Sequence, residues 1–142
     1  MRFPHWEYPE IIEGKPTKYS WVVQNKDGLI LGIQTDIGAF SYINAKKGVV
    51  IEDFVQIGSH CSIYSISTID NKEGKVVLDR NCRIGSHSIV MPGVHIGKNT
   101  IIGAFSFVTE NIPQNAVAFG VPAKIIRMHS KEQIEKLESD TK

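Results

Sequence analysis

Two histidines and one aspartate are the side chains best suited to move a proton in this chain. His60 and His87 stand at turn positions of a repeating sequence pattern, and Asp70 lies between them in a polar stretch. A neutral imidazole accepts a proton near pH 7, and a carboxylate can orient or deprotonate a substrate. These three residues are therefore the catalytic candidates, whereas His95 occupies an outward strand position and is interpreted as structural.

A six-residue period determines where these side chains lie. Aliphatic residues recur every six positions with two short slips, at Leu31, Ile37, Ile43, Ile51, Ile57, Ile63, Ile69, Leu78, Ile84, Val90, Ile96, Ile102 and Val108. Small or β-branched residues follow four positions later, at Thr35, Ser41, Val55, Cys61, Ser67, Cys82, Ser88, Val94, Thr100 and Ser106. This period fits a short strand plus a turn and does not fit an amphipathic helix. Three such units close a triangular coil, and stacked coils form a parallel β-helix with the aliphatic residues inside.

The composition narrows the class of protein. The chain has 142 residues, 42% of them hydrophobic and 22% charged, with a formal net charge of +1. One domain is expected, and the charge balance argues against a nucleic-acid binder with a broad basic face. No apolar run approaches the roughly 20 residues of a membrane span. No secretory signal is visible, and Cys61 and Cys82 make no disulfide framework, so we expect a cytoplasmic protein in which both thiols pack in the core.

The period divides the single domain 1–142 into three segments. Residues 1–30 lack the repeat and are rich in aromatic side chains, so we expect a cap that contributes to a substrate pocket. Residues 31–127 form the β-helix, interrupted by a polar excursion at 70–77. Residues 128–142 form a tail with a short helix over 130–139, because Ser130 and Gln133 have the spacing of a capping box.

Three stretches carry a family resemblance. They are IGSHSIVMPGV at 84–94, IGAFSFVT at 102–109 and GVPAKIIR at 120–127. Together they resemble the hexapeptide-repeat acyltransferases, and most of all the galactoside, maltose and nucleotide-amino-sugar acetyltransferases. The resemblance implies an all-β fold, a left-handed parallel β-helix with a short C-terminal α-helix. It also implies a homotrimer with three active sites between subunits and acetyl-CoA as the co-substrate.

The resemblance assigns roles residue by residue. Ser86, Ala104 and Thr109 match positions that line the pantetheine arm of the cofactor, and Lys124 and Arg127 match basic residues near its phosphates. Two departures stand out in the sequence. Glu110 replaces a lysine that often follows the threonine in galactoside-type enzymes, and the stretch 67–71 lacks their catalytic histidine.

The missing histidine favours one acceptor. A sugar hydroxyl needs a base to become a nucleophile, whereas an amine already carries its lone pair. We therefore expect N-acetylation of a nucleotide-linked amino sugar in surface-polysaccharide biosynthesis, with acceptor contacts from residues 1–30 and 70–77. Counting hexads predicts that His60 and His87 lie on different faces, so that a trimer would bring one from each subunit into a shared cleft. A backbone N–H near Ser86 is the expected donor to the oxyanion.

Three alternatives stay open at this point. The chain can be a sugar O-acetyltransferase, or a non-catalytic trimeric module that binds coenzyme A or a partner. A zinc protein like the γ-class carbonic anhydrases would use His60, His87 and His95 as ligands. The spacing of these histidines does not resemble that class and GVPAK would go unexplained, so no metal is expected.

Overall fold

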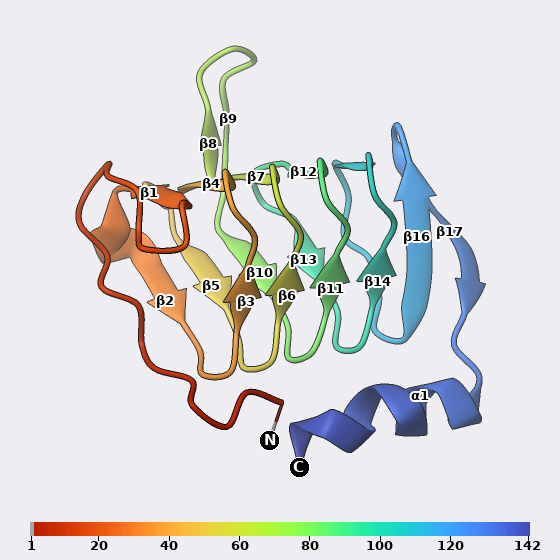
Figure 1. The fold of residues 1–142 in the computed structure, drawn as a ribbon. Coiled ribbons are helices and arrows are strands. Elements are labelled where there is room, and N and C mark those ends of the chain that lie inside the picture. Colours follow the sequence, from red (N-terminus) through yellow and green to blue (C-terminus); the bar gives the residue numbers. More distant parts are fainter. Residues whose placement is uncertain (1) are drawn as a thin grey trace.

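The computed structural model describes residues 2–142, which wind into a three-sided left-handed β-helix (Figure 1). Each full coil adds one strand to each of three parallel sheets. Sheet one contains β1 (Val22–Gln24), β4 (Tyr42–Asn44), β7 (Ser62–Tyr64), β12 (Ile89–Val90) and β15 (Phe107–Val108). Sheet two contains β2 (Leu29–Leu31), β5 (Val49–Ile51), β10 (Val76–Leu78) and β13 (His95–Ile96). Sheet three contains the parallel strands β3 (Asp36–Ile37), β6 (Gln56–Ile57), β11 (Arg83–Ile84), β14 (Ile101–Ile102) and β16 (Ala116–Gly120), and β17 (Ala123–Met128) joins it antiparallel to β16.

Three corners join the sheets, and we name each by its contents. Sheet one passes to sheet two at the hairpin corner, where β8 (Ile66–Ser67) and β9 (Lys72–Glu73) form an antiparallel hairpin. Sheet two passes to sheet three at the asparagine corner, which holds Asn81, Asn99 and Asn115. Sheet three passes to sheet one at the aromatic corner, which holds Phe40, His60, His87 and Phe105. These residues have positive φ, a backbone conformation for which Asn and His are enriched.

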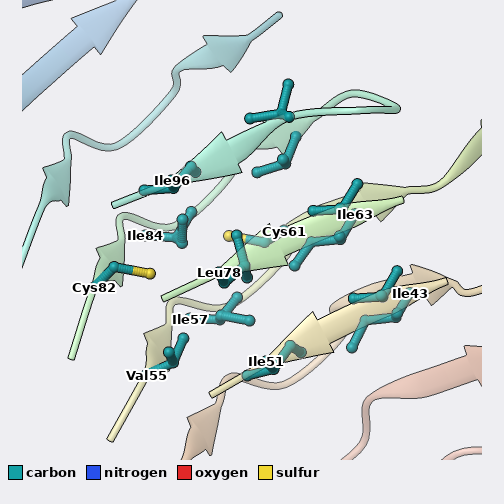
Figure 2. Packing of buried hydrophobic residues seen from close by; sticks show 14 of the residues in the cluster. Ile43, Ile51, Val55, Ile57, Cys61, Ile63, Leu78, Cys82, Ile84 and Ile96 are labelled. Carbon is teal, nitrogen blue, oxygen red and sulfur yellow. The ribbon is translucent and has the colours of Figure 1, made fainter. Parts of the chain in front are cut away.

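The interior confirms the predicted aliphatic column with one exception. Every member of that column from Leu31 to Val108 is buried apart from Ile69, and the small residues four positions later are buried apart from Ser67. Figure 2 shows equivalent side chains stacked coil on coil, as Ile57 and Ile84 are. The parallel register places like residues side by side, so each inward residue packs against its equivalents one coil away.

Glycine before the aromatic corner allows the coils to stack this closely. A Cβ on Gly58 would lie 2.5 Å from the backbone nitrogen of Ser86, and one on Gly85 would lie 2.4 Å from that of Ala104. Contacts below about 3 Å do not occur for real Cβ atoms, so only glycine fits. The turns of successive coils therefore lie directly on each other's backbone, which fixes the corner residues in a column.

The excursion begins earlier than the repeat predicts. Ile69, expected inside, is 95% exposed on the loop of the β8–β9 hairpin. The chain re-enters sheet two at Val76, before the expected end of the excursion 70–77. The reason is that Val76 and Leu78 both fill the core from β10, and a hairpin that leaves and returns at one corner adds no residues to the coil.

The ends of the β-helix also differ from the expected boundaries. The first coil begins at Val22, because β1 and β2 already pair in parallel with β4 and β5. The turn with the 3-10 helix η1 (Lys26–Gly28) is a coil corner joining β1 to β2. At the other end, β17 (Ala123–Met128) turns back antiparallel to β16 after a cis Val121–Pro122 peptide.

The expected C-terminal helix is present, and it brings the two ends of the chain together. Helix α1 (Lys131–Glu138) starts at a capping box in which Ser130 and Gln133 bond reciprocally, and it is followed by η2 (Ser139–Thr141). The C-terminal end of α1 lies on the asparagine corner, since Asn81 Nδ2 donates to the Leu137 carbonyl at 2.9 Å. Arg2 binds Asp140 at 2.8 Å and Asn81 at 2.7 Å, so both termini lie on this corner (Figure 1).

Ile63 and Ile69 provide a matched test of the register, because they are six positions apart and only Ile63 is inside. Ile63→Ala is expected to lower the free energy of unfolding by about 2–5 kcal/mol through the cavity it leaves. Ile69→Ala is expected to change it by about 0.5 kcal/mol or less. Denaturant titration at equal protein concentration measures both, and equal losses would show that the repeat continues through Ile69.

Candidate functional site at the aromatic corner

Four aromatic rings form a continuous stack along the aromatic corner. The His60 and His87 rings are parallel, with centroids 4.6 Å apart and an interplanar angle of 4°. Phe40 lies 5.1 Å from His60, and Phe105 lies 5.0 Å from His87. The coil spacing of about 4.8 Å matches the separation of stacked rings, so equivalent turn positions bring the rings into contact. We call Phe40, His60, His87 and Phe105 the ring stack.

The ring stack corrects the sequence expectation for the histidines. His60 and His87 were expected on different faces, but they lie on one corner of one chain, one coil apart. The hexad count was wrong because it included the hairpin, whose residues stand outside the coil. Backbone bonds hold the register, since His60 N–H donates to the Ala39 carbonyl at 2.9 Å and His87 N–H donates to the Ser59 carbonyl at 3.0 Å.

Ser86 and Ala104 precede the histidine and phenylalanine of the last two turns in the stack. Phe105 N–H donates to the Ser86 carbonyl at 3.0 Å, which ties the two turns together. Within the described residues, the backbone N–H groups of Ser86 and Ala104 donate to no acceptor of the chain. Ala104 is exposed and Ser86 half-buried, so these two turn residues lie at the surface beside the two imidazoles.

The flanking phenylalanines were not singled out in the sequence. Phe40 and Phe105 are 67% and 68% exposed, which is unusual for large apolar side chains. Their position in the repeat is the signal that could have found them. Phe40 stands two residues after Gly38, and Phe105 stands two residues after Gly103. His60 and His87 have the same spacing from Gly58 and Gly85. Aligning the turns in the right register would have found them.

Asp70 does not meet the histidines within one chain. It lies exposed in the loop of the β8–β9 hairpin, with Lys72 Nζ 3.6 Å away. A hydrogen bond from the Ser67 side chain and the charge of Lys72 hold the pKa of its carboxyl below the ordinary value, so it is ionised at neutral pH. The hairpin corner and the aromatic corner are opposite edges of sheet one. Only a second copy of the chain can therefore bring Asp70 to a ring stack.

His95 stands apart from the ring stack. It projects from β13 in sheet two, and its Nε2 lies 2.7 Å from Asp79 Oδ2. This contact is consistent with the structural role expected for it. His60, His87 and His95 do not converge within one chain, because sheet two is bounded by the other two corners.

The two candidate phosphate ligands lie at different ends of β17. Lys124 pairs with Phe119 near the β16–β17 turn, whereas Arg127 pairs with Val117 and donates to Gln133 Oε1 at 3.0 Å. Three residues span about 10 Å along an extended strand. Arg127 thus faces the cleft under α1 that Arg83 and Lys136 also line, while Lys124 lies on the side of the aromatic corner.

Thr109, Glu110 and the two cysteines are the remaining residues that the sequence singled out. Thr109 and Glu110 are exposed directly after β15, at the edge of sheet one opposite Ala104. Cys61 and Cys82 are buried and free, as expected of packing residues. Burial raises the pKa of both thiols, and the Cys61 thiol donates to the Gly85 carbonyl at 3.2 Å, so neither is poised as a nucleophile.

The chain builds its parallel β-helix from a six-residue repeat, and comparison with known proteins agrees. The family model for bacterial transferase hexapeptide (six repeats) matches residues 75–110. The chain belongs to this hexapeptide-repeat acyltransferase family. The galactoside O-acetyltransferases of Lactococcus lactis and Escherichia coli are both 36% identical over 111 residues, 68% of this chain. The alignments cover 54% and 55% of those proteins, so the chain spans about half of the curated relatives' length.

Two solved structures extend the similarity. A galactoside acetyltransferase in complex with coenzyme A has a TM-score of 0.72 at 27% identity, covering 80% of this chain and 62% of that one. A variant of AntD, an N-acyltransferase from Bacillus cereus in complex with dTDP-4-amino-4,6-dideoxyglucose and coenzyme A, has a TM-score of 0.59 at 27% identity. That alignment covers 85% of this chain and 75% of AntD. In the described part of this chain, no helix has the length and apolarity needed to cross a membrane.

Proposed function

We propose that this protein is an acetyl-CoA-dependent acetyltransferase that N-acetylates a nucleotide-linked amino sugar, as in surface-polysaccharide biosynthesis. One observation carries the acyl transfer: the stacked His60–His87 pair lies beside the unpaired backbone amides of Ser86 and Ala104 on one exposed corner. The likeness to AntD, an N-acyltransferase whose structure holds a nucleotide-linked amino sugar, supports the amine as acceptor. The likeness to enzymes whose structures hold coenzyme A supports the cofactor. Two buried free cysteines fit a reducing cytoplasm.

The cofactor would lie along the aromatic corner. The small side chain of Ala104 leaves its backbone open to the pantetheine arm, and the Ser86 N–H can donate to the thioester oxygen as negative charge develops there. Thr109 extends this surface across the last strand of sheet one. Lys124, on the side of the aromatic corner, would offset phosphate charge, whereas Arg127 would have to leave Gln133 to do so.

The ring stack supplies the proton acceptor. The amine nitrogen attacks the thioester carbonyl carbon, an N–C bond forms, and the C–S bond breaks. The ammonium proton passes to a neutral imidazole of His60 or His87 and then to the departing thiolate of coenzyme A. Protons and electrons balance within amine, thioester and imidazole. In this proposal the histidines of the aromatic corner serve as the proton sink that an amine nucleophile requires.

The proposed active unit is a homotrimer with sites between subunits. Asp70 and the ring stack occupy opposite edges of sheet one, so a site that uses both needs two copies. Phe40 and Phe105 are large apolar side chains left exposed in one chain, and burying them would favour association. In this arrangement Asp70 of one copy would orient the sugar amine near the histidines of the next.

A sugar O-acetyltransferase is the second candidate, because the relatives at 36% identity are galactoside O-acetyltransferases. The group that becomes acetylated, an amine or a hydroxyl, distinguishes the N-acetyltransferase from the O-acetyltransferase. Purified protein is incubated with acetyl-CoA and matched pairs of nucleotide sugars that differ only in bearing an amine or a hydroxyl. Release of free thiol and mass spectrometry of the sugar measure transfer. We expect amide products, and acetylation of hydroxyls alone would reject N-acetylation.

Replacing both histidines tests the proton acceptor. His60→Ala and His87→Ala together are expected to lower kcat by about 10²–10⁴, the usual contribution of a positioned general base. His95→Ala serves as the matched control, because this histidine binds Asp79 on another sheet. Steady-state rates at saturating substrates, with circular dichroism to check folding, give the answer. Full activity in the double variant would remove the ring stack from the mechanism.

Enlarging Ala104 tests the path of the cofactor. Ala104→Leu is expected to raise KM for acetyl-CoA about tenfold or more, equivalent to roughly 1.4 kcal/mol of binding, by covering the turn backbone. Ala39→Leu makes the same change at the equivalent position before Phe40, three coils away, and should leave this KM unaltered. A cofactor KM raised equally by both variants, or by neither, would place acetyl-CoA elsewhere.

A further inference from the structure

The segment before the first coil and the start of β3 line a surface pocket that the reaction described above does not use. Its volume is about 400 Å³, within the usual range for small-molecule sites. Four large aromatic side chains and the imidazole of His5 line it, and the acidic residues Glu7 and Asp36 belong to the same lining. The aromatic residues are Phe3, Trp6, Tyr19 and Trp21.

The walls of the pocket are held in place by specific contacts. Trp6 Nε1–H donates to the Thr35 carbonyl at 2.8 Å, and Trp21 is only 2% exposed, as part of the core. Buried Gln34 bonds Phe3 twice, accepting from its N–H at 2.7 Å and donating to its carbonyl at 2.8 Å. These bonds fix the N-terminal segment against the first coil, so the rings are positioned before a ligand arrives.

The chemistry of the lining selects the class of ligand. No lysine or arginine is among the lining residues, and Glu7 and Asp36 are two hydrogen-bond acceptors with negative charge. His5 adds an imidazole to this lining, but the two acidic residues disfavour a phosphate there. A planar ring that stacks on aromatic side chains and donates N–H groups to carboxylates fits, and a nucleobase has both properties.

The pocket lies at the start of the aromatic corner. Tyr19 and Trp21 flank Ser20, the turn residue of the first coil, and Phe40 N–H donates to the Ser20 carbonyl at 2.7 Å. His60 and His87 follow in the next coils along this corner, each step about 4.8 Å. The pocket is thus roughly 10–15 Å from the histidine pair. A ribose and a diphosphate can bridge that gap outside the acidic pocket.

We infer that this pocket binds the nucleobase of the acceptor, so that the attached amino sugar reaches the histidine pair. The inference rests on the proposed function for the identity of the acceptor. The base would stack on the aromatic wall and donate to Asp36 and Glu7, while the diphosphate follows the corner toward Phe40. Binding energy from the base would then position the amine, although no bond of the base changes.

Tryptophan fluorescence tests the inference directly, because both tryptophans of the chain, Trp6 and Trp21, line the pocket. Uridine, thymidine and guanosine diphosphates are titrated in turn, with free tryptophan correcting for absorbance. Inorganic pyrophosphate and a free amino sugar are the ligand controls. We expect saturable quenching by at least one nucleoside diphosphate and none by either control. Failure of all three nucleotides, or equal quenching by pyrophosphate or the free sugar, would overturn the inference.

Charge variants locate the binding. Asp36→Asn is expected to weaken nucleotide binding about tenfold, the loss typical of a charged hydrogen bond, and to raise the acceptor KM without changing that of acetyl-CoA. Asp27→Asn, in the turn of η1 and outside the pocket, is the matched control. Equal affinity in Asp36→Asn and the native protein would contradict the assignment. Nucleotide binding at the pocket without acetyl transfer to any amine would keep the inference and refute the proposed function instead.

Discussion

The stacking of turn on turn at the coil corners is the constraint on which the rest of this protein depends. Gly58 and Gly85 lie against the backbone of the next coil so closely that a methyl group would collide with it. Because each turn is seated on the one before, residues at equivalent turn positions form columns along the corners. The repeat therefore builds a core and also three straight edges, on which side chains far apart in sequence come into contact.

The three columns carry different chemistry because different residue types occupy the same backbone conformation. At the asparagine corner, Asn81 and Asn99 bond to each other and to the end of α1, so this column fastens the termini. A hydrogen bond from Arg2 and the charge of the same guanidinium lower the pKa of the Asp140 carboxyl below its ordinary value, which favours the ionised form that holds the termini together. At the aromatic corner, the same left-handed turns hold rings that stack and leave backbone amides open.

The aromatic corner gives the proposed active site its order. Read from the first coil, it presents an acidic aromatic pocket, then the histidine pair, then the open turns of Ser86 and Ala104. This spatial order matches the proposed reaction. The nucleobase end of the sugar substrate comes first, the imidazole that takes the proton comes next, and the thioester comes last. Sheet one keeps the hairpin corner away from this line within a chain, so a role of Asp70 beside the histidines would require a second copy of the chain.

The sequence by itself determined the β-helix, its inward column, the capping box of α1 and the family, because these depend on local period and local motifs. It also pointed to His60, His87, Ser86 and Ala104 as a candidate set. Their juxtaposition was decided only by the tertiary structure, because a hairpin that leaves and rejoins the same corner adds residues without adding rotation. Counting along the chain cannot distinguish such residues from coil, and for that reason Ile69 was placed inside and the histidines apart. Packing decides which residues belong to the coil, since only Val76 and Leu78 can fill the core beneath β5.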